Sequence, residues 1–288
     1  MVEWVKHSTE HVGLSYLDEG HGPTIVALHG FPDTWRTWDR ASAVLIRAGY
    51  RVVHMALRGY APSGIPADRR YDVDALAHDV LSLIDHLGLE EVVILGHDWG
   101  ASTAYELARR APERMRAIVA MAVPPPATAI GGWRERMARP HNLYLALGPL
   151  ADWWLRLNDF AEVRRLDRLW SPSWEGNEKH VGTVIDDLRF RERSRASVDF
   201  YRRSHMNRSP TGLPSMPSLL IYGSVEPKVR RDGFEAARDG LTAPSRVVRI
   251  EGVGHWPHLE APDAVLEEIL DFLGACIANG VPELSGDL

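Results

Sequence analysis

The chain is poor in cysteine and lysine. Its only cysteine among 288 residues is Cys276, which excludes an internal disulfide and a cysteine-ligated metal site. Lysine occurs only at Lys6, Lys179 and Lys228, and the other basic residues are arginines interleaved with acids. Because the formal net charge is −6 as well, we expect no nucleic-acid partner.

Long apolar runs are also missing. The first residues, "MVEWVKHSTEHVG", lack the apolar stretch of a signal peptide. No window reaches the roughly 18 apolar residues of a membrane span. We therefore expect a soluble, cytoplasmic protein without a membrane partner. The composition, 45% hydrophobic and 25% charged, is typical of a globular protein and leaves both a monomer and a homodimer open.

What the sequence does contain is an alternation of apolar runs with amphipathic segments. Apolar residues recur at helical spacing in 35–48, 72–88 and 99–111. The apolar runs are rich in β-branched residues and apolar on both faces, which is typical of buried parallel strands. They are "TIVALHG" (24–30), "RVVHMAL" (51–57), "VVILGHD" (92–98), "AIVAMAV" (117–123), "PSLLIYG" (217–223) and "SRVVRIEG" (245–252). This alternation predicts an α/β fold with a mostly parallel central sheet flanked by helices.

The alternation is interrupted after Val123. "PPPATAIGG" follows, and residues 133–205 have a helical pattern with many arginines and tryptophans. An insertion of about 90 residues is too long for an ordinary loop. We predict an α/β core formed by residues 1–124 and 214–288, with an inserted helical cap, or lid, at 125–213.

The segment "LGHDWGA" (95–101) lies between an apolar run and a helical pattern. Small residues at Gly96 and Gly100 permit a sharp turn that presents Asp98 at the carboxyl end of a strand, as in a nucleophile elbow. The start of the helix behind it favours an anion. The pattern therefore predicts Asp98 as a nucleophile, and an aspartate that only caps the helix is the alternative.

A second loop, "HGFPD" (29–33), follows the first apolar run. Its position predicts that the backbone N–H groups of Phe31 and Trp99 form an oxyanion hole beside Asp98. A plain turn that uses Gly30 and Pro32 is the alternative.

A base and an acid follow the last two apolar runs. His255 lies in the glycine-flanked loop "GVGHWPHLEAP" (252–262), and His258 is its competitor. Glu226 in "IYGSVEPKV" (221–229) is the predicted acid that orients His255, while Asp232 falls within the next helix. The order of nucleophile, acid and histidine is the one expected for an α/β-hydrolase.

Taken together, these motifs resemble the epoxide hydrolase branch of the α/β-hydrolase superfamily, which is related to haloalkane dehalogenases. The resemblance covers nearly the whole chain: "HGFPDTW", "LRGYAPSG", "GHDWGA", the helical cap, "YGSVEP" and "GVGHWPHLEAP". It implies that Asp98 attacks an epoxide carbon and forms an alkyl-enzyme ester. Water activated by His255 and Glu226 would then hydrolyse that ester to give a vicinal diol.

The resemblance also implies two proton donors in the cap. "DFYRRSH" (199–205) matches the stretch with the second donor and identifies Tyr201. For the first donor, the alignment places His141 where the family has tyrosine, and Tyr144 one helical turn later. The chain also differs from the family at Ala56 and Glu226, where aspartate is the usual residue.

We expect an apolar, medium-sized epoxide and water as partners, with no cofactor and no metal. The predicted substrate contacts are Trp99, Phe31, Pro32, Tyr144 and Trp256. The other cap aromatics are expected to form the core of the cap: Trp133, Trp153, Trp154, Phe160, Trp170, Trp174, Phe190 and Phe200.

Two other functions compete with this prediction. A haloalkane dehalogenase would use Asp98 and the Trp99 indole, but such enzymes carry Asn or Glu in place of Phe31 to bind halide. Haloacetate dehalogenases have arginine at the position of Trp99. A hydrolase fold that binds ligands without catalysis is a third possibility, and the complete set of nucleophile, base, acid and oxyanion donors argues against it.

Overall fold

An eight-stranded sheet forms the centre of the computed structural model, which describes residues 3–130, 133, 137, 139–175, 177–203, 212–242 and 244–277. The strand order is β1-β2-β4-β3-β5-β6-β7-β8. The strands are β1 (Val5–Ser8), β2 (Gly13–Glu19), β3 (Thr24–Leu28), β4 (Arg51–Ala56), β5 (Val92–His97), β6 (Met115–Met121), β7 (Ser218–Gly223) and β8 (Arg246–Ile250). β1 and β2 pair in an antiparallel manner, and the pairs from β4 to β8 are parallel.

This architecture confirms the predicted α/β-hydrolase class, and all six predicted apolar runs contain a strand. The antiparallel strands β1 and β2 were not predicted. β1 is short and largely exposed, and β2 has four consecutive buried residues in place of an alternating pattern. Neither strand therefore carries the periodicity from which a strand is recognised.

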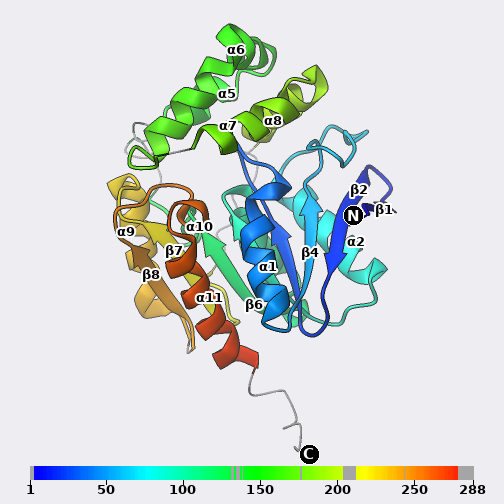
Figure 1. Ribbon diagram of the computed structural model, residues 1–288, viewed down its shortest axis with the longest axis vertical. Coiled ribbons are helices and arrows are strands. Elements are labelled where there is room, and N and C mark those ends of the chain that lie inside the picture. The colour runs from blue at the N-terminus through cyan, green and yellow to red at the C-terminus, as the bar shows by residue number, and fades with distance from the viewer. Residues whose placement is uncertain are drawn as a thin grey trace, which may run out of the picture.

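Helices cover both faces of the sheet (Figure 1). On one face, α1 (Asp39–Arg47) and α11 (Pro262–Ile277) pack with β3, β5, β6 and β7 in one apolar cluster. On the other face lie α2 (Val73–His86), α3 (Trp99–Arg110) and α9 (Lys228–Ala237). Among the helices of the described chain, none combines the length and apolarity that a membrane crossing requires.

The cap helices gather at one end of the sheet (Figure 1). They are α5 (His141–Leu145), α6 (Pro149–Trp170), α7 (Glu178–Leu188) and α8 (Arg191–Arg203). α6 is kinked at Leu157–Phe160, where Asn158, Asp159 and Phe160 have positive φ angles. These helices lie within the predicted cap, whose limits at 125 and 213 stay a prediction.

The expectation that the cap aromatics form its core is only partly right. Phe160 and Phe200 are buried. Four others, Trp133, Trp153, Trp154 and Phe190, are between 50% and 70% exposed. Periodicity could not separate the two groups, because the cap is a thin layer in which both helix faces carry aromatic residues.

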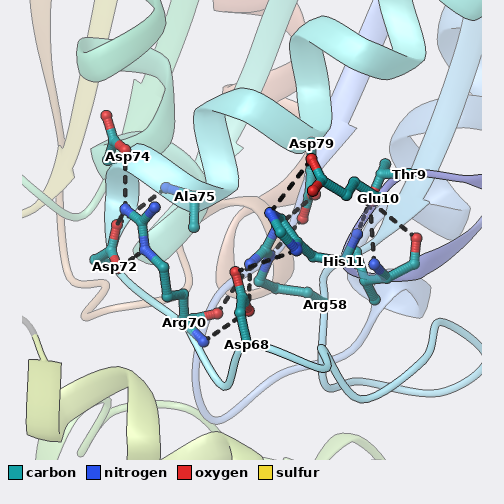
Figure 2. A network of polar contacts seen from close by, with 11 residues as sticks. Thr9, Glu10, His11, Arg58, Asp68, Arg70, Asp72, Asp74, Ala75 and Asp79 are labelled. Carbon is teal, nitrogen blue, oxygen red and sulfur yellow. Dashed lines mark hydrogen bonds and ion pairs between the residues drawn. The ribbon is translucent and has the colours of Figure 1, made fainter.

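A polar network anchors the loop that connects β4 to α2 (Figure 2). Arg58, which is 1% exposed, donates two hydrogen bonds of 2.6 Å to Asp79 on α2. At the end of the loop, Arg70 pairs with Asp72, and the Asp72 carboxylate caps α2 by accepting from the Ala75 N–H at 3.1 Å. The network therefore fixes both ends of a loop on which the cap rests.

The cap meets this loop at Gly59 and Ser63. A Cβ atom at Gly59, whose φ is 85°, would lie 2.8 Å from the Ala196 methyl group on α8. Arg193 of α8 donates to the Ser63 carbonyl at 2.5 Å. The position of α8, and with it that of Tyr201, therefore depends on this loop.

Replacement of Asp79 by asparagine should destabilise the protein strongly. The buried Arg58 charge would lose the carboxylate that accepts two of its hydrogen bonds, and removing one partner of a buried ion pair typically lowers the free energy of unfolding by about 3–5 kcal/mol. Urea denaturation measures this loss. Asp263→Asn removes the partner of Arg40 in an exposed pair and should have little effect. Equal losses in the two variants would contradict a buried anchoring role for the Arg58–Asp79 pair.

Candidate active site

The turn between β5 and α3 holds Asp98 in a conformation that side chains rarely adopt. Its φ and ψ angles are 51° and −108°. The turn packs against β3 so tightly that a Cβ atom at Gly100 would lie 2.1 Å from the Leu28 carbonyl oxygen. The two flanking elements therefore keep Asp98, which is 5% exposed, at the carboxyl end of the sheet.

The loop after β3 supplies the first partner of Asp98. The Phe31 N–H donates to Asp98 Oδ1 at 3.0 Å. A Cβ atom at Gly30 would lie 2.4 Å from the Asp98 Cβ, so glycine permits this close approach. Phe31 thus occupies the place predicted for one oxyanion donor. Trp99 opens α3 directly after Asp98, and its N–H stays the predicted second donor.

The predicted base and acid lie next to Asp98. His255 Nδ1 lies 2.7 Å from Glu226 Oε1. Its other ring nitrogen, Nε2, lies 3.6 Å from Asp98 Oδ2 and has no hydrogen-bond partner within the described chain. Since a carboxylate only accepts, Nδ1 carries the proton and Nε2 can accept one. Glu226, and not Asp232, contacts His255; Asp232 pairs with Lys228 on α9.

The charges of the three residues support one another. Burial alone would raise the pKa of Asp98, but His255, followed by His97 and Arg230, lowers it well below its ordinary value. Burial opposes a charge on His255 too, yet Glu226 and Asp98 raise its pKa overall. For Glu226, the charges of Arg230 and His255 outweigh burial and lower the pKa. Asp98 is therefore ionised at neutral pH.

Arg230 is a buried cation beside this group that was not predicted. It is 5% exposed and donates to the Ala122 carbonyl oxygen. Its Nη1 atom lies 3.4 Å from Glu226 Oε1 and 3.3 Å from His255 Nδ1. The only sequence signal for Arg230 was its position one helical turn after Glu226. Most arginines at this spacing form ion pairs on the protein surface.

A second unpredicted group links His255 to the cap. The His255 N–H donates to the Trp170 carbonyl at 3.1 Å and to Ser171 Oγ at 2.9 Å. Glu260 accepts from Ser171 Oγ at 2.6 Å, and from the N–H groups of Gly254 and Trp256 at 2.8 and 3.0 Å. The end of α6 and the histidine loop therefore hold each other in place.

The predicted cap donors lie close to this site. Tyr201 is 2% exposed, and its ring centroid lies 5.2 Å from that of Phe31 and 5.5 Å from that of Trp99. His141 is 3% exposed, and its ring lies 6.2 Å from that of Tyr201. Burial, followed by the charge of Arg139, lowers the pKa of His141 to about 2, so its ring is neutral.

His141 also borders a small cavity next to the acid–base pair. The cavity is lined by His141, Trp170, Glu226 and His255 among others, and it has room for about one water molecule. Neither ring nitrogen of His141 has a hydrogen-bond partner among the residues that the structure describes. A neutral imidazole here can offer one N–H to a bound molecule.

The Tyr144 hydroxyl points to a different part of the cap. It donates to Glu162 at 2.5 Å and accepts from Arg165 at 3.0 Å. Together with Leu147 and Trp154, Tyr144 lines an apolar groove between α5 and α6. Of the two alternatives for the first donor, only His141 borders the cavity at His255.

Trp256 and Pro32 are two further predicted substrate contacts. Trp256 is fully buried, its ring lies 5.0 Å from that of His255, and its Nε1–H donates to Asp33 Oδ2 at 3.1 Å. Pro32 is buried as well. This geometry favours a supporting role for Trp256, whereas Phe31 and Trp99 face Tyr201.

A strand-turn-helix elbow, an acid and a histidine after successive later strands, and an inserted helical cap together define an α/β-hydrolase. The sequence profile of the alpha/beta hydrolase fold family matches residues 23–262. The chain therefore belongs to this family, as the sequence motifs predicted.

Named relatives and a solved structure resemble the chain over nearly its full length. An "Epoxide hydrolase" from Caballeronia sordidicola is 28% identical and covers 92% of each chain. "Epoxide hydrolase A" from Mycobacterium tuberculosis is also 28% identical, over 92% of this chain and 95% of the relative. The structure of a candidate epoxide hydrolase from Pseudomonas aeruginosa superimposes with a TM-score of 0.82, at 24% identity and 96% coverage of both chains.

Replacement of Glu226 by glutamine should lower the pKa of His255. The Glu226 charge raises this pKa, so its removal leaves burial and Arg230 to disfavour the imidazolium. NMR titration of the His255 ring measures the shift. Asp232→Asn is the matched control, because Asp232 pairs with Lys228 and should leave the titration unchanged. A larger shift in the Asp232 variant would show that Glu226 is not the acid of this site.

Proposed function

We propose that the protein is an epoxide hydrolase that converts an apolar epoxide into a vicinal diol through an ester of Asp98. The observation that carries this proposal is the position of the Asp98 carboxylate, with Oδ1 on the Phe31 N–H and Oδ2 near His255. The names of the relatives support the same activity. The proposal includes a core of residues 1–124 and 214–288, a cap at 125–213 and no cofactor for this reaction.

In the first step, a lone pair of Asp98 Oδ2 forms a bond to an epoxide carbon. The electrons of the broken ring bond stay on the epoxide oxygen, which becomes an alkoxide. Tyr201 and His141 donate hydrogen bonds to that oxygen, and one of them supplies its proton. Burial raises the pKa of Tyr201 well above its ordinary value, so the hydroxyl keeps the proton that this step requires.

In the second step, water attacks the carbonyl carbon of the ester. His255 Nε2 takes a proton from this water, while the Nδ1–H group keeps its hydrogen bond to Glu226. The charge that develops on Oδ1 is stabilised by the Phe31 N–H, which already donates to this atom. The tetrahedral species then releases the diol, whose oxygen takes the proton back from His255. Asp98 is left as a carboxylic acid, and its proton returns to the donor that was deprotonated in the first step, which regenerates the carboxylate.

The surroundings of Asp98 do not suit halide release equally well. The side chain at position 31 is a phenyl ring that packs edge-on against Tyr201 at 5.2 Å. It offers no donor to a departing halide, so the Trp99 indole would lack the second ligand that dehalogenases use. The ring of Tyr201, in contrast, lies beside Phe31 and Trp99, which supports its proposed role as the proton donor to an alkoxide.

The covalent intermediate can be trapped in His255→Gln. Asp98 still attacks in this variant, but the ester persists because no base activates water. Intact-mass measurement after incubation with styrene oxide should show one added substrate mass, and Asp98→Asn should show none. Turnover of wild-type enzyme with no adduct in His255→Gln would contradict the covalent path. Bromide release from 1-bromobutane without diol formation from styrene oxide would instead assign a dehalogenase.

The two donors should each contribute to ring opening. Tyr201→Phe and His141→Phe are expected to slow single-turnover formation of the ester by about 10- to 100-fold each, because general acids typically contribute 10²- to 10⁴-fold and here two groups share the task. Tyr144→Phe is the control, since its hydroxyl is held by Glu162. Slow ester formation in Tyr144→Phe with a normal rate in His141→Phe would reverse the assignment of the first donor.

A further inference from the structure

A second cluster of buried polar side chains lies beside His255 and Asp98. It consists of Asp33, His97 and His258. Asp33 follows the oxyanion loop, His97 ends β5 directly before Asp98, and His258 lies in α10 (Pro257–Glu260). Asp33 and His97 are fully buried, and His258 is 5% exposed. One ligand atom from each residue lies within 4.8 Å of the other two.

The tautomer of His97 is set by its outer contact. His97 Nε2 lies 2.8 Å from the carbonyl oxygen of His255, and a carbonyl only accepts, so Nε2 carries the proton. With its proton on Nε2, the neutral ring presents its lone pair on Nδ1. Nδ1 has no hydrogen-bond partner among the described residues and lies 3.7 Å from Asp33 Oδ2.

His258 is oriented in the same way. Its Nε2 lies 2.6 Å from Thr37 Oγ1. With the proton on Nε2, which donates to the threonine hydroxyl, the ring leaves its lone pair on Nδ1. His258 Nδ1 therefore also has a free lone pair, and it too has no hydrogen-bond partner in the described part of the chain.

The Nδ1 lone pairs of His97 and His258 and the Asp33 carboxylate thus lie close together in the buried interior. The ion-pair contacts of Asp33 within the described chain are with histidines, at 3.7 Å from His97 and 3.9 Å from His180. Asp33 also accepts hydrogen bonds from the Thr34 N–H at 2.7 Å and from the Trp256 Nε1–H at 3.1 Å. An imidazole that presents one nitrogen inward and donates the other N–H to a carbonyl or hydroxyl is the arrangement found around metal ions.

We propose that Asp33, His97 and His258 form a structural site for a divalent transition-metal ion, with zinc as the ion that suits two imidazoles and one carboxylate. The fourth position of a tetrahedral ion falls to water or to the second Asp33 oxygen. No metal site was expected from the sequence. The three ligands lie on distant segments and follow no ligand-spacing motif. This proposal is independent of the proposed epoxide hydrolysis.

Such an ion would join the three loops that build the active site. Asp33 lies two residues after Phe31, His97 precedes Asp98, and His258 lies three residues after His255. Because all three ligands are sealed from solvent, the ion must enter while the chain folds. Metal removal should therefore lower the melting temperature of the protein rather than abolish one chemical step.

The test measures metal in protein produced without a histidine tag. Wild-type chain expressed in zinc-supplemented medium and dialysed should hold about one zinc per chain, and chain refolded with Co²⁺ should show the visible absorption of a nitrogen- and oxygen-bound cobalt ion. Asp33→Asn and His258→Gln, which keep the size of the side chains, should each lower zinc affinity by at least about 100-fold, since even outer-shell changes cost 10- to 100-fold. His54→Gln, a buried histidine of β4 outside the cluster, should retain the metal.

Wild-type protein that contains no metal after this treatment and shows no cobalt absorption would overturn the proposal, and a proton held by Asp33 would then account for the cluster. Retention of one zinc per chain in both Asp33→Asn and His258→Gln would overturn it as well. If one variant fails to fold, the other variant and the cobalt spectrum of the wild-type chain still decide the question.

Discussion

The structure depends on one requirement, that the Asp98 carboxylate stay ionised while almost fully buried. A buried charge without partners is strongly destabilising, so the fold must supply them. The Phe31 N–H provides one at 3.0 Å, and His255 approaches the other oxygen at 3.6 Å. The tight elbow, the glycine at position 30 and the loop after β8 are each positioned to bring these groups together.

The acid–base pair is itself stabilised by a further layer of contacts. Arg230 lies against Glu226 and His255 and keeps the Glu226 carboxylate charged. Ser171 and Trp170, at the end of α6, bind the backbone of His255, and Glu260 binds Ser171. The cap therefore contributes to the position of the base in addition to carrying Tyr201. A change at the contact between these helices and the core will consequently act on His255 as well as on Tyr201.

Local motifs sufficed for those parts of the site that lie at the ends of strands. Asp98, Phe31, Glu226 and His255 each follow an apolar run, and the parallel order of the runs brings them to one edge of the sheet. Arg230 and Glu260 could not be found in this way, because contacts with residues that are distant in sequence, Ala122 and Ser171, bury or orient them, and their local surroundings are typical of an ordinary helix surface. The same applies to Tyr144, whose hydroxyl is held by Glu162 on a different helix.

By itself, the sequence determined the class of fold and the carboxylate at the turn after β5, and it predicted the order of nucleophile, acid and base, because these depend on periodicity and on short turns. Only the tertiary structure decided which buried groups surround them. It directed Tyr144 away from the cavity at His255, exposed Trp133, Trp153 and Trp154 of the cap and brought Asp33, His97 and His258 together. Burial and long-range packing govern these outcomes, and neither is encoded in the spacing of residues along one segment.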